Sequence, residues 1–364
     1  MGSRRQAPVP VFGRARFSWV RQTASELFAC NIHPMITPAL RRFLLASLIV
    51  LSLADRVFAA DQLAASRSLL PAHARVLVLG DSITQDGRYV TFLEYYLDRL
   101  TPPAGCDVVS IGLSGETVSG LTEKGEAHPR SWALERLDRA LAAVKPSVVI
   151  ACYGMNDGIY HPSDPARLAA FTDGLRVFIG KVRATGALLV LVTPPVFDPL
   201  PLKSKVVPAG GAEFGYGHPF EGYDGVLAEF AAAEVALHVD GVTVIDLHTP
   251  MAAALATHRL QDPAFSFAKD GVHPGDLGHL VMARVIADGL GLALPAAPAE
   301  AELARIQADP VFALVRDRRE LRSETWLPFV GYIHNEPYKS AFVTAAEKAA
   351  ARLQAEIDAL VVAK

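Results

Sequence analysis

The chain of 364 residues lacks the sequence patterns that mark most cofactor and metal sites. It contains no H-E-x-x-H pair, no G-x-x-x-x-G-K loop, and no G-x-G-x-x-G after its first predicted strand, so we expect neither a metal nor a nucleotide cofactor. The formal net charge is -3 and no basic stripe stands out in the bulk of the chain, which argues against a nucleic-acid partner. With 51% hydrophobic residues, the composition suits a soluble globular protein with a sizeable core.

Cysteines are also scarce, with three in the whole chain. Cys30 lies in the N-terminal region, which leaves Cys106 and Cys152 without a recognisable spacing pattern. Cys152 lies in an apolar segment, and a free cysteine often behaves as a small buried hydrophobe. An exported protein could oxidise the pair, but two cysteines define no framework, so we predict no disulfide.

Long hydrophobic runs are absent as well. The apolar run Phe43–Leu53 is shorter than the roughly 20 apolar residues that a membrane span needs. Arg41 and Arg42 precede it, and the small pair Ala59–Ala60 follows. A basic start, an apolar middle and a small-residue cleavage site together predict a secretory signal peptide over residues 35–60. An amphipathic or buried helix is the alternative, and the charged flanks disfavour it.

The signal prediction makes Met35 the natural start and residues 1–34 an upstream extension or a mis-assigned start. Ordinary export to the periplasm or the extracellular space is favoured, because the paired arginines lack the spacer of a twin-arginine signal. No cysteine follows the apolar run, so a lipid anchor is not expected there. After cleavage, no stable membrane span would remain.

From residue 75 onwards, strand and helix patterns alternate. Short apolar runs rich in Val and Ile predict strands buried on both faces, at residues 75–80, 107–112, 147–154, 187–194 and 242–248. Helical spacing follows in the segments 89–100, 131–144, 166–184, 222–238 and 275–290. Such βαβ units predict an α/β fold with a parallel sheet covered on both faces, whose ligands bind at the carboxyl ends of the strands.

The predicted sheet domain spans residues 70–292, and a linker-like break separates it from a helical C-terminal extension over residues 298–364. Within the extension we expect helices at 300–320 and 340–361. The packed face of the second is predicted to include Phe342, Leu353, Ile357 and Leu360.

The long loop Pro199–Tyr223 is rich in Gly and Pro and is predicted to lie at the ligand-facing edge of the sheet. Such loops are often functional. A lid and a decorative surface loop are both compatible with the sequence.

The stretch "VLVLGDSITQDGRYV" places Ser82 immediately after the first predicted strand. Asp81 can cap the next helix or brace the loop, and taken alone the stretch favours a plain turn and cap. A serine needs a base to become a nucleophile, and His273 in "DGVHP" is the candidate. Asp270 lies three residues earlier, where its carboxylate can reach the imidazole and fix its tautomer.

An acyl-transfer site also needs preorganised donors for an oxyanion. Gly115 in "SIGLSGET" and Asn156 in "CYGMNDG" follow the second and third strands, and the Ser82 N–H is the third candidate donor. Alone, Gly115 could simply permit a positive φ, and Asn156 could belong to a turn. Together with Ser82, Asp270 and His273, they favour a catalytic serine site.

Residues beside the predicted oxyanion loop are open to two interpretations. Tyr153, Asp157, Tyr160 and His161 could line an acyl or sugar pocket, or could simply pack the loop. His279 falls on a predicted helix and is expected to be packed or to face solvent.

The motifs "GDSIT", "GLSGET", "GMND" and "DGVHP", between residues 80 and 274, resemble those of the SGNH hydrolases, also called GDSL esterases. The resemblance implies a flavodoxin-like three-layer α/β/α sandwich with a five-stranded parallel sheet. Carried over by position, it makes Ser82 the nucleophile, Gly115 and Asn156 oxyanion donors, His273 the base and Asp270 its partner. Ser110 departs from the family, whose members often have Asn there, so a supporting hydrogen bond is expected to differ.

We therefore expect a serine esterase that forms an acyl-enzyme and removes short acyl groups, acetyl above all, from carbohydrate. A lysophospholipase or thioesterase acting on lipid-like esters is the alternative within the same chemistry. A non-hydrolytic carbohydrate-binding protein on the same scaffold is the alternative outside it. The sequence leaves the oligomeric state open.

Overall fold

A computed structural model describes residues 69–100, 105–124, 129–332 and 340–362 of the chain. The predicted upstream extension and signal peptide, over residues 1–60, lie outside these ranges. Within them, every helix is too short or too polar to cross a bilayer.

Five parallel strands form one sheet in the order β2-β1-β3-β4-β5. Their bounds are β1 Arg75–Gly80, β2 Asp107–Ser110, β3 Val148–Cys152, β4 Leu188–Val192 and β5 Val242–Ile245. The Val- and Leu-rich centres of β1 and β3 are buried on both faces, as parallel strands between helical layers must be. The predicted α/β fold with a five-stranded parallel sheet is confirmed.

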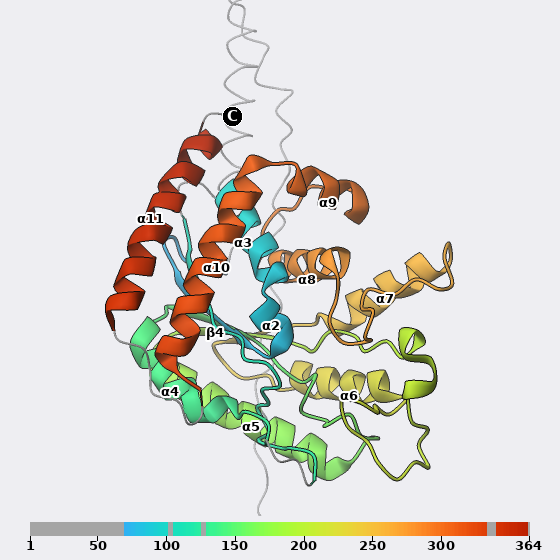
Figure 1. The fold of residues 1–364 in the computed structure, drawn as a ribbon. Helices are drawn as coiled ribbons and strands as arrows, with labels where there is room; N and C mark the ends of the chain where they lie inside the picture. The colour runs from blue at the N-terminus through green and yellow to red at the C-terminus, as the bar shows by residue number, and fades with distance from the viewer. Residues whose placement is uncertain (1–68, 101–104, 125–128, 333–339, 363–364) are drawn as a thin grey trace, which may run out of the picture. The chain divides into compact units, whose positions relative to one another are not determined.

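Helices cover both faces of the sheet (Figure 1). α3 (Arg88–Leu100) and α8 (Asp276–Gly289) pack together on one face, and α4 (Ala133–Val144), α5 (Pro165–Ala184) and α6 (Tyr223–Val235) cover the other. These five helices agree with the predicted segments to within a few residues. The three-layer arrangement implied by the family resemblance is therefore present.

Two further α-helices of the sheet domain were not predicted, α2 (Ser82–Asp86) and α7 (His248–Arg259), and neither was the short 3-10 helix η1 (Leu200–Lys205). α2 has only five residues, too few to show a hydrophobic period. α7 has four alanines among its twelve residues, and alanine favours helix through its low side-chain entropy cost without adding to an apolar stripe.

The described residues of the C-terminal extension form three helices rather than the two predicted. α9 (Ala299–Gln307) and α10 (Pro310–Val330) replace the single helix expected at 300–320. Pro310 has no N–H with which to continue α9. Asp309 instead caps α10 by accepting a hydrogen bond from the Val311 N–H at 3.1 Å.

α10 lies against the edge strand β2 and has three buried arginines, Arg318, Arg319 and Arg322. Arg318 pairs with Glu94 at 2.6 Å and Asp98 at 3.0 Å, both on α3. Arg322 donates to the carbonyl of Val108 in β2 at 2.7 Å. The extension thus covers an edge that would otherwise present unpaired backbone groups.

α11 (Ser340–Val362) packs on α10, but with a different face from the one predicted. Ile357 is fully buried, whereas Phe342 is 60% and Leu360 37% exposed. The expected packed face was therefore wrong for these two residues. The buried positions on α11 are Val343, Ala346, Ala350 and Ile357. The two alanines among them let the helices approach closely.

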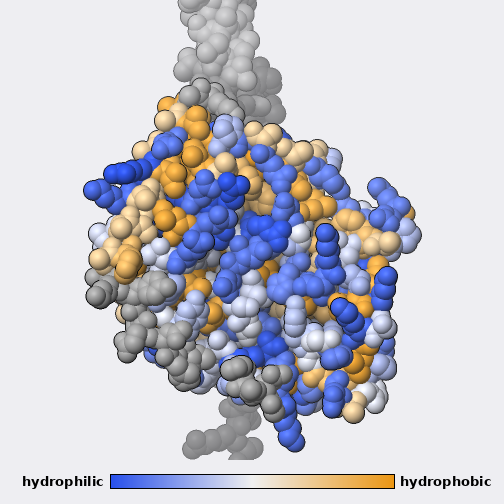
Figure 2. Space-filling model, viewed as in Figure 1, coloured by the Kyte–Doolittle hydropathy of each residue, from blue (hydrophilic) through white to orange (hydrophobic). Residues whose placement is uncertain are grey.

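The exposed surface of this side of the molecule is mostly hydrophilic. Figure 2 shows a hydrophilic band across its centre and apolar surface around the end of α11. Leu360 and Val362 are the exposed apolar residues there.

Replacing Ile357 by Ala should lower the free energy of unfolding by about 2–5 kcal/mol, because it leaves a cavity between α10 and α11. Leu360→Ala removes the same kind of side chain from an exposed position and should change it by no more than about 0.5 kcal/mol. Urea unfolding of both variants measures the difference. Equal effects would contradict the assigned packed face.

Candidate active site

The candidate site lies at the carboxyl ends of β1, β2 and β3. Ser82 is the first residue of α2, directly after β1. Gly115 and Asn156 lie in the loops that follow β2 and β3. β1 lies between β2 and β3, so the chain leaves β1 in one direction and crosses back to reach β3. That reversal is where open parallel sheets bind ligands.

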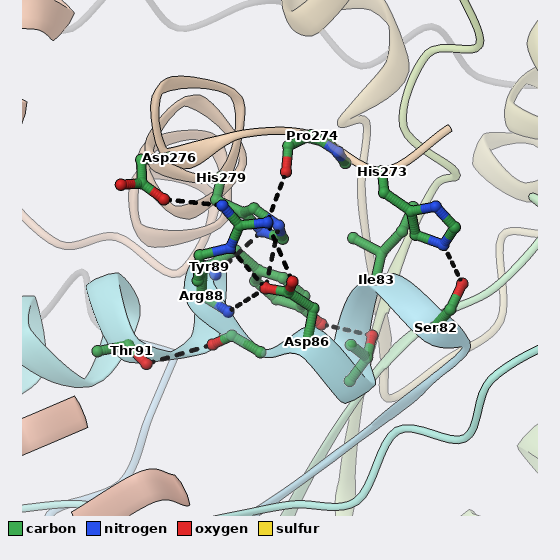
Figure 3. A network of polar contacts seen from close by, with 12 residues as sticks. Ser82, Ile83, Asp86, Arg88, Tyr89, Thr91, His273, Pro274, Asp276 and His279 are labelled. Carbon is green, nitrogen blue, oxygen red and sulfur yellow. Dashed lines mark hydrogen bonds and ion pairs between the residues drawn. The ribbon is translucent and has the colours of Figure 1, made fainter. Parts of the chain in front are cut away.

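Ser82, His273 and Asp270 form a continuous series of hydrogen bonds. The Ser82 hydroxyl is 2.7 Å from Nε2 of His273 (Figure 3), and Nδ1 of His273 is 2.7 Å from Oδ2 of Asp270. The other oxygen of Asp270 accepts the N–H groups of Val272 at 3.1 Å and His273 at 2.8 Å. The loop that carries this pair lies between α7 and α8, not directly after β5.

Hydrogen bonding between Asp270 and His273 shifts the pKa of both side chains. Partial burial opposes ionisation of Asp270, but hydrogen bonds from His273 and Val272 outweigh it and hold the pKa of Asp270 well below its ordinary 3.8. The hydrogen bond that His273 donates to Asp270 raises the pKa of His273 above its ordinary 6.5, against the effect of burial. Asp270 is thus ionised and orients a basic His273.

Asp81 supports the position of Ser82 by capping the helix that Ser82 begins. Its carboxylate accepts the Ile83 N–H at 3.0 Å and so caps α2. The side chain is buried, and burial raises the pKa of Asp81 to about 7. It acts as a brace for the turn and does not line the cleft.

The β2 loop is pressed closely onto α2. A Cβ atom on Gly112 would lie 2.3 Å from the backbone nitrogen of Gln85, so only glycine permits this approach. The Gln85 side chain in turn accepts the Ser114 N–H at 2.6 Å. Gly115 has a φ of 72°, the left-handed conformation that glycine favours.

Two backbone N–H groups remain available at this point. Neither the Ser82 nor the Gly115 N–H takes part in the backbone hydrogen bonds that the structure describes. Asn156 is buried, and its amide nitrogen donates to the Glu116 carbonyl at 3.3 Å. The three predicted oxyanion donors are therefore brought to adjoining loops.

Tyr153 and Asp157 lie behind the loops, so the structure favours loop packing over the alternative of a pocket lining. Asp157 is buried and accepts the N–H groups of Val118, Ser119 and Gly154 at 2.9, 2.7 and 3.0 Å. Burial raises the pKa of Asp157 to about 6. Through these bonds it joins the loop after β2 to the loop after β3.

A buried ion pair strengthens the same junction. Glu116, next to Gly115, accepts two hydrogen bonds from Arg136 of α4, both at 2.6 Å. The Tyr153 hydroxyl donates to the same carboxylate at 2.7 Å. The side chains of Glu116 and Arg136 are 0% and 1% exposed.

Arg88 connects α2 to the loop that carries His273, a role that the sequence did not suggest (Figure 3). It donates to Asp86 at the end of α2, to Asp276 at 2.8 Å, and to the carbonyl of Pro274 at 3.0 Å. Its partners beyond Asp86 lie more than 180 residues away in the chain, so no local pattern could reveal them. His279 lies alongside; burial lowers its pKa to about 4.

A cleft of about 1010 Å³ opens beside Gly115. Its lining includes Arg130, His161, Phe214 and Tyr216. Tyr216 comes from the long loop 199–223, and its hydroxyl donates to Asp270 at 3.3 Å. The loop thus borders the candidate site, whereas Tyr160, also considered for the pocket, is buried.

Ser110, the position at which the chain departs from the family, is buried on β2. Among the residues that the structure describes, its hydroxyl finds no hydrogen-bond partner. Ser110 therefore supplies no supporting side-chain hydrogen bond among these residues.

Ser82, His273 and Asp270 thus lie in one hydrogen-bonded series at the carboxyl edge of a five-stranded parallel sheet. The sequence profile of the GDSL-like lipase/acylhydrolase family matches residues 78–281, more than half of the chain. The chain therefore belongs to this family and is an ester hydrolase.

The chain is similar to an acetylxylan esterase from Geobacillus stearothermophilus. The two are 26% identical over 234 residues, which cover 60% of this chain and 94% of that protein. A solved structure of a catalytic mutant of an acetylxylan esterase from the same organism has 21% identity and a TM-score of 0.44, covering 62% of this chain and 97% of that one. A gut microbial diltiazem-metabolizing enzyme has 18% identity and a TM-score of 0.45. The match covers 62% of this chain and 48% of that enzyme, so the chain spans about half of its length.

Replacing Arg136 by Met should cost about 3–5 kcal/mol of unfolding free energy, because it leaves the Glu116 carboxylate buried without its cation. The double variant Arg136→Met/Glu116→Gln buries no unpaired charge and should recover part of that loss. Denaturant unfolding measures both. A double variant less stable than Arg136→Met alone would contradict this account of the pair.

Proposed function

We propose that Ser82 is the nucleophile of this esterase, with His273 as its general base and Asp270 as the residue that orients His273. The observation that carries the proposal is the series of two 2.7 Å hydrogen bonds from Ser82 through His273 to Asp270. A neutral imidazole that donates from Nδ1 to a carboxylate presents Nε2 as an acceptor for the serine proton.

In the first half of the reaction, Ser82 Oγ attacks the ester carbonyl carbon while His273 Nε2 takes its proton. The carbonyl oxygen becomes an oxyanion, held by the N–H groups of Ser82 and Gly115 and by the amide of Asn156. Asp270 stabilises the imidazolium. The tetrahedral intermediate collapses, the alcohol leaves with the proton from His273, and the acyl group remains on Ser82.

In the second half, His273 accepts a proton from water as the water oxygen attacks the acyl carbon. The oxyanion forms again at the same donors. Collapse breaks the bond to Ser82 Oγ, His273 returns the proton to the serine, and the carboxylic acid departs. No step draws on a group outside the chain, water and the ester.

For the substrate, we propose a short acyl group, acetyl above all, carried on a carbohydrate. The similarity to an acetylxylan esterase supports this choice. The cleft beside Gly115 supports it as well, because aromatic and polar side chains such as Phe214, Tyr216 and His161 suit a sugar ring. The signal pattern of residues 35–60 supports action outside the cytoplasm.

The nucleophile assignment predicts that Ser82→Ala loses hydrolysis of p-nitrophenyl acetate by about 10⁴-fold or more, because removal of a triad serine leaves only binding and the oxyanion donors. Ser163→Ala serves as the control, since this serine contacts Glu229 at the surface and should leave the rate unchanged. The wild type should hydrolyse the acetate ester faster than the butyrate and octanoate esters.

Each contrary result has its own meaning. Ser82→Ala with wild-type activity would show that another group attacks the ester. A preference for octanoate would favour lipid-like esters and overturn the carbohydrate proposal alone.

The raised pKa of His273 predicts an acid limb in the pH profile of kcat/KM. Only neutral His273 can accept the serine proton, so activity should fall as the pH drops through the pKa of His273, with a midpoint above 6.5. In Asp270→Asn, loss of the carboxylate removes the main cause of the raised pKa. The midpoint should therefore move to lower pH while the maximal rate drops. An unchanged midpoint in this variant would contradict the coupling.

A further inference from the structure

Arg130 lies in the segment before α4, at the wall of the cleft, and its side chain is 12% exposed. Its Nε donates to Glu123 at 2.8 Å, and a second N–H reaches the other oxygen of that carboxylate. The guanidinium also stacks over the ring of Tyr160, 5.5 Å from its centroid. Bidentate pairing and stacking hold the group in one orientation.

The remaining edge of the guanidinium points at the candidate oxyanion donors. Nη1 of Arg130 is 2.9 Å from Oδ1 of Asn156 and 3.4 Å from the carbonyl of Gly115. One arginine thus contacts two of the three residues proposed to hold the oxyanion.

The contact with Oδ1 decides which way the Asn156 amide faces. An asparagine amide presents an acceptor at one end and two donors at the other, and the two orientations have nearly the same shape. Arginine can only donate, so a reversed amide would place two donors against each other. The Tyr160 hydroxyl, 3.1 Å from Oδ1, could donate or accept and would tolerate either orientation.

The second end of the amide is held less firmly. Asn156 Nδ2 donates to the Glu116 carbonyl at 3.3 Å, a long bond, and keeps its other hydrogen for an oxyanion. The charge-assisted bond from Arg130 is shorter and therefore supplies most of the orientational preference.

The action of Arg130 is short-ranged. Glu123 neutralises its charge within the same cluster, so its direct attraction for an oxyanion is small. Its effect on the reaction passes instead through the hydrogen bond to Asn156.

We infer that Arg130, anchored by Glu123, is a positioning residue that holds the Asn156 amide with its nitrogen toward the oxyanion. The inference rests on the proposed function, because it assigns to Arg130 control over a donor of that same site. An aligned donor matters in the transition state, where negative charge develops, more than in substrate binding.

The test is a double-mutant cycle of Arg130→Met and Asn156→Ala with p-nitrophenyl acetate as substrate. Asn156→Ala should lower kcat by about 100- to 1000-fold, as the loss of one oxyanion donor does. Arg130→Met should lower kcat by about 10- to 100-fold with KM within about twofold, because the donor is misaligned and not removed. The kcat of the double variant should lie within about twofold of the kcat of Asn156→Ala, because Arg130 then has no amide to orient.

Two further variants separate this role from a general loss of structure. Arg139→Met is the matched control: this arginine of α4 donates to the carbonyls of Val330 and Tyr332, and its loss should leave kcat unchanged. Arg130→Lys keeps one donor but loses the bidentate pairing, so its kcat should lie between those of the wild type and Arg130→Met. It also serves as the test if Arg130→Met does not fold. Melting temperatures are measured for every variant.

Three results would overturn the inference. The first is a wild-type kcat in Arg130→Met. The second is a loss confined to KM, which would place Arg130 in substrate binding. The third is an Arg130→Met effect that persists at full size in the Asn156→Ala background. Failure of the proposed function is distinct, because it appears as activity in Ser82→Ala whatever Arg130 does.

Discussion

The parallel pairing of β1 with both β2 and β3 is the constraint on which the rest of the structure depends. Parallel strands end at the same edge of a sheet, so this pairing brings the loops that hold Ser82, Gly115 and Asn156 side by side. β1 and β3 tolerate burial because they are mostly apolar and pair with a neighbouring strand on each side. The helical extension serves the same sheet by covering its β2 edge.

Carboxylates in the interior hold the loops in place where the strands end. Loops leave backbone N–H groups unpaired, and burial of such groups is costly unless an acceptor is provided. Asp81 and Asp157 are those acceptors for the loops after β1, β2 and β3. Glu116 and Arg136 add a neutral buried pair at the same junction. The oxyanion site that we propose needs donors that are already in place, and these hydrogen bonds hold the loops that carry them.

The family resemblance predicted the correct family and fold class, but not the fine structure of the helices. The strands followed from short apolar runs and five of the helices from helical spacing, because burial in an α/β sandwich leaves both patterns in the sequence. α7 was not predicted because its alanines form no apolar stripe. The break before Pro310 was missed because the segments on its two sides continue one helical pattern. The packed face of α11 was misjudged because its buried residues are Val343, Ala346, Ala350 and Ile357, whereas Phe342 and Leu360 are exposed.

The sequence by itself determined the α/β class, the order of the strands along the chain and the motifs around Ser82, Gly115, Asn156 and His273. These are local properties, because a buried strand and the turn after it are written in consecutive residues. Only the tertiary structure decided which distant side chains support them. Arg88 and Arg130 find their partners across loops and helices. A long-range contact leaves no period or spacing in a single sequence, so it becomes visible only once the chain has folded.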